Sequence, residues 1–396
     1  MKKLWQMFFL SIGLFLLVCS QGDLVQAAPV SSGSWKIIAS SNPPGDDSLF
    51  AVAAISLNDA WAVGSSGQDG PSPMTLTEHF NGTQWSVIPS PNPGPSSNKL
   101  YSVAATTMND VWAVGYSYNS PPQTLILHYD GTQWSVIASP SPGSFNNQLL
   151  SVSAISAHDA WAVGYAASNT TTQALIEHYN GSSWEVIPGP ALSSSYYELD
   201  AVTALSSTNV VAVGSFINQQ GNSQALIEHW NGSRWKVLSG PNPGSSSRLN
   251  GVVAVSSSDI WAVGEFTPPQ SNAATLIEHF DGNTWQVVSS PNRSALNYNG
   301  LVSVTALSAS DVWAVGQSGI SNGDAPHGSF SQSQVFPRTL IEHFDGSKWR
   351  IAASPNLGTS DTLTGVSSVS GTGHAWAVGS YYNSAPPVQT LTEFYG

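Results

Sequence analysis

Short apolar runs alternate with polar turn residues along most of the chain. In one repeat the runs cover residues 49–56, 60–64, 75–80 and 85–90, and Ser, Asn, Asp, Gly and Pro separate them. Runs of this length, rich in Val, Ile, Thr and aromatic residues and bounded by turn residues, predict β-strands. Each repeat therefore predicts four short strands, which we call A to D in chain order.

The four-strand pattern recurs together with the tetrapeptide Trp-Ala-Val-Gly in strand B. Successive copies are 51, 49, 50, 50, 52 and 63 residues apart. A period of about 50 residues of strand-like sequence is typical of a β-propeller with one repeat per blade. We therefore predict an all-β fold, a seven-bladed β-propeller of four-stranded antiparallel blades. The copies begin at Trp61, Trp112, Trp161, Val211 (Val in place of Trp), Trp261, Trp313 and Trp376.

The side chains within a repeat indicate the order of the strands from the axis outward. Strand A carries small residues, as at 51–54, and blades converge toward the axis, so strand A is expected to be innermost. Strands B and D carry the large Trp residues, which suit wider outer positions. Strands C and D are joined by Asn-Gly or Asp-Gly, as at Asn81-Gly82, and these dipeptides favour a tight hairpin.

The two ends of the chain predict how the ring closes. Residues 34–40, which include Trp35, form a strand D with no A, B or C before it, and the sequence stops at Gly396, just after a strand C. The N-terminal strand is therefore expected to complete the last blade, which leaves no open sheet edge. The predicted propeller spans 29–396, with blades at about 49–90, 100–139, 149–188, 199–239, 249–290, 301–354, and 363–396 plus 34–40.

Residues 1–28 are typical of a signal peptide, with Lys2 and Lys3 before an apolar stretch and a small-residue cleavage site near Ala27. The expected location is extracellular after secretion; the alternative is a lipid anchor through Cys19. Removal of this segment changes the formal net charge from −13 to −14 and removes the single Cys. The mature chain then lacks disulfides and thiolate metal ligands, and its acidity argues against nucleic-acid binding. No later stretch is long enough to span a membrane, and we expect a monomer.

The repeat resembles those of the kelch and galactose-oxidase-like propellers. The resemblance rests on 61–64, Phe80 and Trp85, which follow the kelch order of a strand ending in Gly, an aromatic residue and a Trp, although Val63-Gly64 stands where kelch repeats have Gly-Gly. The chain is also similar to exported bacterial proteins built from Trp-Ala-Val-Gly repeats, a resemblance that implies no particular activity. A galactose-oxidase-type copper site is excluded because its crosslinked Cys has no counterpart.

Four residue types recur around the ring and are interpreted as structural. Strand C usually contains Glu-His, as at Glu78-His79, and an Asp such as Asp59 stands two positions before the Trp of strand B. We expect the His to donate a hydrogen bond to that Asp within each blade, and the Trp residues to form the core between blades. A catalytic or metal site needs one asymmetric cluster, whereas these groups repeat at blade-sized separations. We therefore predict no catalytic residue, no metal and no cofactor.

The connections divide into two faces. The A–B and C–D connections are short and regular, whereas the D–A and B–C connections share the other face and vary between blades, as a recognition surface would. Aromatic residues amid Ser, Asn and Gln suit sugar stacking or a protein contact there; the alternative is that they only cap the blade edges. The candidate aromatic residues are Tyr116, Tyr118, Tyr165, Phe216, Phe266, Tyr381 and Tyr382.

Arg248, Arg293 and Arg338 are expected on the same variable face of neighbouring blades. Sialidase propellers bind a carboxylate with three Arg residues, and the Asp-Gly-x-x-Trp hairpins resemble their Asp-boxes without the intervening residue. A glycosidase is therefore the second hypothesis. The first is a secreted, non-enzymatic module that binds a glycan or a protein through the D–A/B–C face, and a purely structural surface protein is the third. The insertion at 317–338 is a further candidate binding loop.

Overall fold

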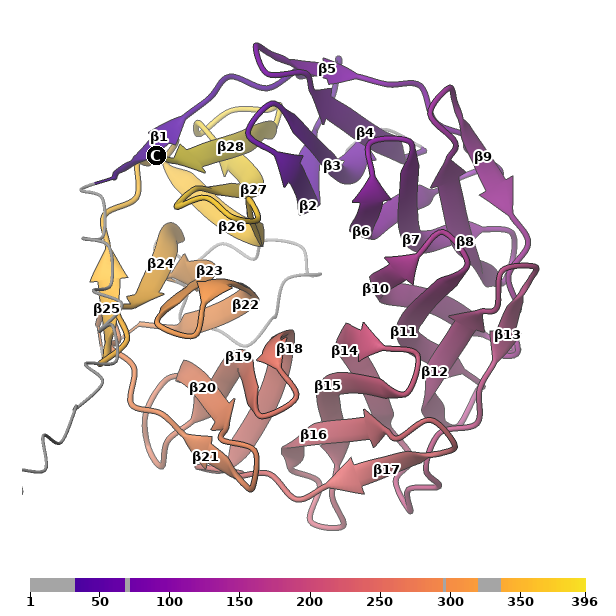
Figure 1. The fold of residues 1–396 in the computed structure, drawn as a ribbon, viewed down its shortest axis with the longest axis vertical. Helices are drawn as coiled ribbons and strands as arrows, with labels where there is room; N and C mark the ends of the chain where they lie inside the picture. The colour runs from indigo at the N-terminus through magenta and orange to yellow at the C-terminus, as the bar shows by residue number, and fades with distance from the viewer. Residues whose placement is uncertain (1–32, 68–71, 295–296, 320–335) are drawn as a thin grey trace, which may run out of the picture. The chain divides into compact units, whose positions relative to one another are not determined.

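The computed structural model describes residues 33–67, 72–294, 297–319 and 336–396. In this part the chain forms seven four-stranded antiparallel sheets arranged in a ring around a central axis (Figure 1). The prediction of a seven-bladed propeller is confirmed. The expected signal segment, residues 1–28, lies outside the described residues, as do residues 320–335 of the insertion.

The strands follow the predicted order A, B, C, D in each of the first six blades. Blades 1 to 3 are β2 (Ser48–Ser56), β3 (Asp59–Ser66), β4 (Met74–Phe80), β5 (Trp85–Val87); β6 (Asn98–Thr107), β7 (Asp110–Tyr118), β8 (Pro122–Tyr129), β9 (Trp134–Ile137); and β10 (Asn146–Ser156), β11 (Asp159–Ala167), β12 (Thr172–Tyr179), β13 (Trp184–Val186). Blades 4 to 6 are β14 (Tyr197–Ser206), β15 (Asn209–Ile217), β16 (Ser223–Trp230), β17 (Trp235–Leu238); β18 (Ser246–Ser256), β19 (Asp259–Thr267), β20 (Ala274–Phe280), β21 (Trp285–Val287); and β22 (Asn299–Ser308), β23 (Asp311–Ser318), β24 (Arg338–Phe344), β25 (Trp349–Ala352). Blade 7 is β26 (Ser360–Ser368), β27 (Ala375–Tyr382), β28 (Gln389–Tyr395) and β1 (Trp35–Ile37).

The N-terminal strand closes the ring, as predicted. Strand β1 pairs antiparallel with β28, with Trp35 opposite Tyr395 and Ile37 opposite Glu393. Ser40 and Asn42 continue the contact, and Asn42 Oδ1 accepts a hydrogen bond from the backbone N–H of Thr390 at 2.8 Å. The last blade is thus built from both ends of the described chain, and β1 covers the edge that the C-terminal strand would otherwise leave open.

A β-bulge recurs in the innermost strand of every blade. In blade 1 the strand pairing shifts between Leu49 and Ala51, so that Phe50 has no partner on β3. The carbonyl oxygen of Ser48 approaches the Gly of Trp-Ala-Val-Gly so closely that a Cβ on Gly64 would lie 1.9 Å from it. The other six equivalent glycines show the same approach at 1.9–2.1 Å. The repeated Gly therefore exists because the bulge presses a backbone carbonyl against it.

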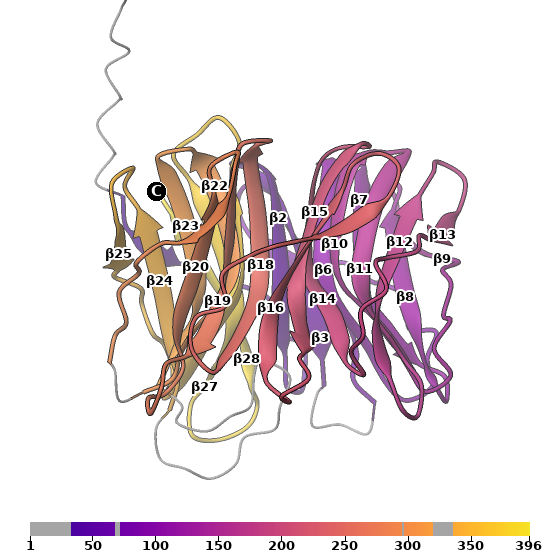
Figure 2. The same ribbon diagram turned by 90° about the horizontal axis from the view of Figure 1, so that it is seen from below.

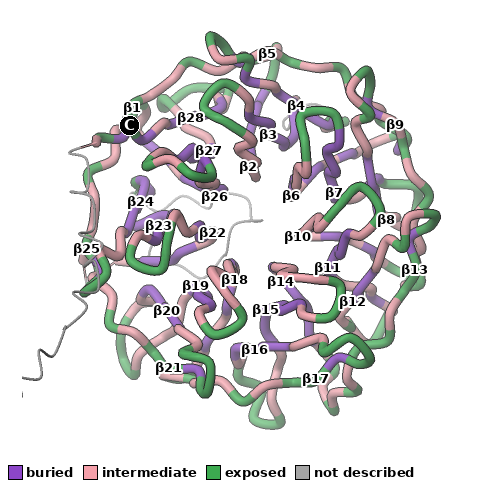
Figure 3. Tube along the Cα trace, viewed as in Figure 1, coloured by how far each residue is buried: buried purple, intermediate pink, exposed green. Residues whose placement is uncertain are grey.

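Indole rings fill the spaces between blades. Trp61 is 1% exposed, and its ring lies 4.6 Å from that of Tyr129 and 5.3 Å from that of Trp134, both on blade 2. Equivalent contacts join blade 2 to 3, 3 to 4, 5 to 6, 6 to 7 and 7 to 1. The buried residues accordingly lie within the blades and between neighbours, while the turns are exposed (Figure 3).

The recurring His and Asp residues form the predicted hydrogen bond within each of five blades. His79 Nε2 lies 2.9 Å from Asp59 Oδ1, and the distances in blades 2, 3, 5 and 6 are 2.6, 2.9, 2.7 and 2.9 Å. In blade 4 Asn209 replaces the Asp and keeps the contact with His229 at 2.8 Å. Blade 7 departs from the pattern, since His374 stacks on Phe394 with ring centroids 5.4 Å apart.

The Glu residues of strand C, next to the His or, in blade 7, next to Phe394, are buried under the preceding blade. Glu177 accepts a hydrogen bond from Ser139 at 2.9 Å, and Glu393 accepts one from Ser354 at 3.2 Å. Burial in a poorly solvated site raises the pKa of each carboxyl to about 8. The six residues are Glu78, Glu177, Glu228, Glu278, Glu342 and Glu393, and blade 2 carries Leu127 instead.

Candidate functional site

A channel runs along the axis and is lined by the first strand of every blade. Its cavity volume is about 240 Å³. Because antiparallel strands alternate in direction, the D–A and B–C connections lie at one end of the ring and the A–B and C–D connections at the other (Figure 2). The bulge lies near the start of strand A, so the bulged side chains surround the channel at the D–A/B–C end. We call this ring the channel mouth, and it consists of Phe50, Tyr101, Leu150, Asp200, Asn250, Val302 and Thr364.

The channel mouth differs from blade to blade, while the residues around it repeat. The residue before each bulged residue is always Leu, the residue after it is Ala, Ser or Gly, and the next is always Val. The Leu residues are buried in the blades. The small residues bind the neighbouring strand in several blades; for example, Ser102 Oγ accepts a hydrogen bond from the N–H of Val152 at 3.2 Å. At the bulged position the seven blades carry seven different residues. Some of these side chains also bind the next blade, as Thr364 does by donating a hydrogen bond to the carbonyl of Leu49 at 2.7 Å.

Arg248 organises the polar side of the mouth. Its Nη2 lies 2.6 Å from Glu198 Oε1 and 2.6 Å from Asp200 Oδ1, both on blade 4. Its Nε donates to Asn250 Oδ1 at 3.0 Å, and Asn250 in turn donates to the carbonyl of Leu301 at 2.9 Å. One guanidinium thus joins blade 4 to blade 5, and Asn250 extends the network to blade 6. This cluster occurs once, in contrast to the repeated His–Asp pairs.

Carboxyl groups exceed cations in this cluster. Burial raises the pKa of Asp200, and the negative charge of Glu198 raises it further, while Arg248 opposes both effects. Asp200 Oδ2 is buried and has no hydrogen-bond partner in the described structure. Asp200 lines the channel, so a ligand that carries a hydrogen-bond donor would satisfy this oxygen and favour the ionised carboxylate.

A second polar pair lies beside Arg248. Tyr298 donates a hydrogen bond to Glu265, whose strand position is opposite Arg248. Gly300 makes room for the pair, since a Cβ at this position would lie 2.3 Å from the Tyr298 hydroxyl and 2.7 Å from Glu265 Oε2. Burial raises the pKa of Glu265, and burial next to Glu265 raises the pKa of Tyr298 well above its usual value.

The opposite arc of the mouth is aromatic. Phe50 and Tyr101 have ring centroids 5.7 Å apart, and Tyr101 stacks on Tyr116 at 5.9 Å. The Tyr116 hydroxyl lies 3.0 Å from Ser97 Oγ, and Asn146 donates to the Tyr165 hydroxyl at 3.0 Å. Two of the predicted aromatic residues, Tyr116 and Tyr165, therefore stand around the channel mouth, on strands next to bulged residues.

The other predicted aromatic residues lie away from this arc. Phe216 and Phe266 pack against the cores between blades 3 and 4 and between blades 4 and 5. Tyr381 packs against the core between blades 6 and 7 and donates a hydrogen bond to Gln389. Tyr118 is 41% exposed, and Tyr382 holds the D–A connection through its carbonyl, which accepts from Thr359.

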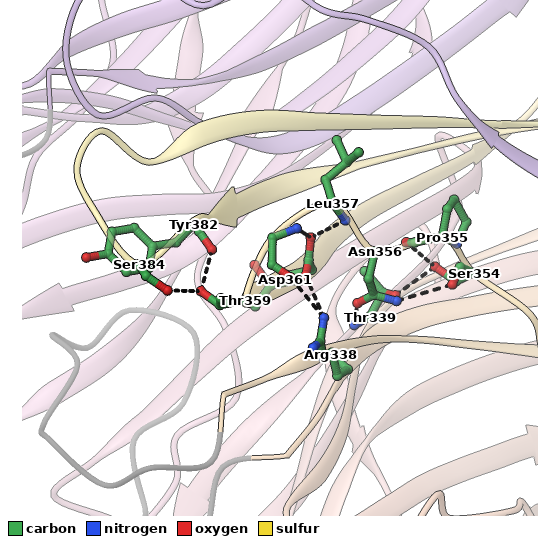
Figure 4. Close-up of polar contacts among 12 residues, drawn as sticks. Arg338, Thr339, Ser354, Pro355, Asn356, Leu357, Thr359, Asp361, Tyr382 and Ser384 are labelled. Atoms are coloured by element: carbon green, nitrogen blue, oxygen red, sulfur yellow. Dashed lines mark hydrogen bonds and ion pairs between the residues drawn. The ribbon is translucent and has the colours of Figure 1, made fainter.

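The three predicted Arg residues have separate surroundings. Arg248 binds blade 4, whereas Arg338 Nη1 binds the next blade, donating to the carbonyl of Gly358 at 2.9 Å and pairing with buried Asp361 at 3.3 Å (Figure 4). Arg293 is exposed in the connection before β22, and its backbone N–H donates to Asn299. No residue contacts both Arg248 and Arg338 in the described structure. The two guanidinium groups therefore share no partner that would hold them together as one anion-binding site.

Sequence reasoning identified Arg248 but missed Asp200, Glu198, Glu265, Tyr298 and the other channel-mouth residues. A signal for the mouth was present, because aligning the seven copies of strand A shows a variable position between the repeated Leu and the small residue. The described residues contain no group of three or more His, Cys, Asp or Glu that could hold a metal ion. In the same part of the chain, no helix has the length and apolar character needed to cross a bilayer.

The fold and this channel define the chain as a seven-bladed β-propeller. No protein-family model and no curated protein matches the sequence. Among solved structures, YCF48 bound to a D1 peptide is 15% identical with a TM-score of 0.53, over 91% of this chain and 96% of that one. The extracellular domain of a hybrid two-component system protein from B. thetaiotaomicron is 10% identical with a TM-score of 0.53, over 90% of this chain and 39% of that one. Trypanosoma rangeli sialidase in complex with sialic acid is 14% identical with a TM-score of 0.47, over 93% of this chain and 59% of that one. The first two likenesses support the propeller fold.

Proposed function

We propose that the chain is a secreted, non-enzymatic recognition module that binds an extracellular protein or glycan at its D–A/B–C face, with the channel mouth as the anchoring site. The observation that carries the proposal is the variable bulged position of strand A, which lines the channel in every blade. Seven blades keep the same Leu and Val around it, but place Phe, Tyr, Leu, Asp, Asn, Val and Thr at the bulge. A position that faces the channel and differs in every blade is suited to ligand recognition.

The chemistry of the mouth favours a protein segment with a Lys or Arg side chain over a neutral glycan. Glu198 and Asp200 share the one guanidinium of Arg248, and Asp200 Oδ2 has no partner in the described structure. An ammonium or guanidinium group of the ligand would donate a hydrogen bond to Asp200 Oδ2 and neutralise the negative charge that Arg248 alone does not balance. The aromatic arc of Phe50 and Tyr101 would contact the apolar part of the same segment.

Peptide and glycan arrays would test the proposal with the mature chain and two variants. Asp200→Asn keeps the size of the side chain and removes the acid, and Leu150→Lys adds a cation at the mouth without touching the Arg248 network. Both should weaken binding of a basic peptide at least about tenfold if a charge-assisted contact is lost. Leu57→Lys is the matched control, because Leu57 is exposed at the A–B turn of the opposite face. Absence of any ligand on both arrays, or equal binding by all three variants, would refute the proposal.

A glycosidase is the second candidate, supported by the Tyr298–Glu265 pair beside Arg248. Tyr can act as a covalent nucleophile when a neighbouring base activates it. However, the raised pKa of Tyr298 makes its phenolate harder to form, and Arg248 is already occupied by two carboxyls. We therefore rank this function below recognition. Turnover of sialosides or aryl glycosides that is abolished in Tyr298→Phe would reverse the ranking.

A further inference from the structure

Blade 4 carries Val211 where the other blades carry the Trp of Trp-Ala-Val-Gly. In the other six blades the indole occupies one repeated environment between two blades. The centroid of the indole lies 4.0–4.8 Å from the ring centroid of the His or Phe in strand C of its own blade. It lies 4.5–5.3 Å from the ring centroid of the last aromatic residue of strand C in the next blade. It also meets the first Trp of strand D in that blade edge to face at 5.1–5.5 Å.

The space left by this replacement remains open between blades 4 and 5. A cavity of about 380 Å³ stands there, within the range of about 300–1,000 Å³ that is usual for small-molecule sites. Its walls are the same groups that hold the indole elsewhere, namely His229, Phe280 and Trp285. The ring centroids of Phe280 and Trp285 are 5.5 Å apart at 36°, against 5.7 Å and 40° for Phe344 and Trp349, which face an indole. The walls have therefore kept the arrangement that accommodates a bicyclic ring.

We propose that this pocket, which we call the blade 4–5 pocket, binds a planar bicyclic aromatic ring of indole size. The pocket is lined by the A–B turn of blade 4, through Thr208 and Asn209, and by the C–D hairpins, through Asn231 and Gly282. It therefore lies at the face opposite the channel mouth, and the proposal is independent of the recognition function proposed above. A bound ring would stack on His229, lie against Phe280 and meet the face or edge of Trp285.

The residues that line the pocket favour a ligand by the shape of its ring, not by a hydrogen bond to it. The Nε1 atoms of all six indoles in the equivalent environments have no hydrogen-bond partner among the described residues, so an N–H on the ligand is not required. The lining residues include no carboxylate, because Asn209 replaces the Asp of the other blades. Burial and nearby Lys236 lower the pKa of His229, which favours the neutral form of its ring. Apolar cavities left by large-to-small replacements take up aromatic molecules in this way.

Isothermal titration calorimetry with free indole tests the pocket in the mature chain. We expect saturable binding of one indole per chain and a rise in melting temperature with indole concentration. Val211→Trp should fill the pocket with the residue that the repeat prescribes, abolishing indole binding and raising the melting temperature without ligand. Val211→Phe is a second variant that fills the pocket with a smaller ring. It should also abolish indole binding, and it covers the case in which the Trp side chain of Val211→Trp does not fit.

Trp161→Val provides the matched control, because it removes the equivalent indole from between blades 3 and 4, where His178, Trp230 and Trp235 surround it. This variant should bind two indoles per chain, and indole should recover part of its lost stability. N-acetyl-tryptophanamide distinguishes the source of the ring: its binding at Val211 would indicate a Trp side chain of a partner, and binding of indole alone would indicate a free small molecule. Absence of saturable indole binding to the mature chain, or unchanged binding in Val211→Trp, would overturn the proposal.

Discussion

The carbonyl oxygen of Ser48 lies 1.9 Å from the position that a Cβ atom on Gly64 would occupy. This contact connects the repeated tetrapeptide with the candidate site, because the bulge that pushes the carbonyl toward Gly64 also turns Phe50 into the channel. The Gly of each repeat is thus required by the same backbone feature that turns one side chain per blade toward the channel.

Replacement of Gly64 by Ala should destabilise the propeller, since backbone cannot yield as a flexible side chain would. We expect a loss of roughly 1–3 kcal/mol in the free energy of unfolding, as for other overpacked positions, measured by denaturant titration. Gly189→Ala is the control, because its Cβ would meet no backbone atom, only the flexible end of Ile176 at 3.3 Å and Glu228 Oε2 at 3.9 Å. Equal losses in the two variants would contradict the role assigned to the bulge.

Removal of one interblade indole should cost more than the loss of any single hydrogen bond in the propeller. Trp161 is 1% exposed and contacts His178, Trp230 and Trp235, so Trp161→Ala is expected to lose about 3–5 kcal/mol. The control is Val211→Ala, at the same position in blade 4, which deletes fewer buried atoms and should lose less. Thermal and denaturant unfolding would check both, and a similar loss in the two variants would mean that the indole is not part of the core.

The fold could be predicted because its determinants are local and repeated. In five blades the Asp stands two positions before the Trp of the tetrapeptide and the His lies near the end of strand C, so their hydrogen bond could be inferred from their places in neighbouring predicted strands. The isolated strand at Trp35 likewise predicted the closure of the ring, because an unpaired strand D and a blade lacking one are complementary.

The site could not be predicted in the same way, because its contacts cross between blades. The register between adjacent blades, which brings Asp200 to Arg248, is not encoded in the pattern of either strand alone. A bulge inserts one extra residue and so shifts the alternation of inward and outward side chains along the rest of the strand. The alternation of apolar and polar residues in the sequence therefore does not show that Phe50 or Asp200 faces the channel. The replacement at Val211 was visible in the sequence, but the cavity depends on Phe280 and Trp285 keeping their places, which only the structure shows.

Asn should substitute for Asp in the His–Asp pairs, because blade 4 already contains this combination. Asn209 binds His229 at 2.8 Å, close to the 2.9 Å between Asp159 and His178. Asp159→Asn should therefore change stability by less than about 0.5 kcal/mol, whereas Asp159→Ala leaves the half-buried His178 nitrogen without its partner and should cost about 1 kcal/mol. Chemical denaturation distinguishes the two, and an equal cost for both would show that the charge, rather than the hydrogen bond, is what the pair supplies.

The six buried Glu residues should make the propeller less stable as pH rises. In the folded chain burial raises the pKa of each to about 8, from an ordinary value of 4.5. Below the unfolded pKa both states are protonated and the stability is complete. Between the two values the unfolded chain has released protons that the folded chain still holds, so stability falls with pH until the folded carboxyls ionise near their raised pKa.

Melting temperatures recorded from about pH 5 to about pH 9 should therefore decline steadily. Glu228→Gln should make the decline shallower by removing one titrating group, and Leu127→Glu should make it steeper, because blade 2 has an apolar residue at the equivalent position. The two changes are opposite in sign at sites of the same geometry, which separates the effect of ionisation from that of packing. A melting temperature that rises over this interval, or variants that leave its slope unchanged, would show that the carboxyls are ionised in the folded chain.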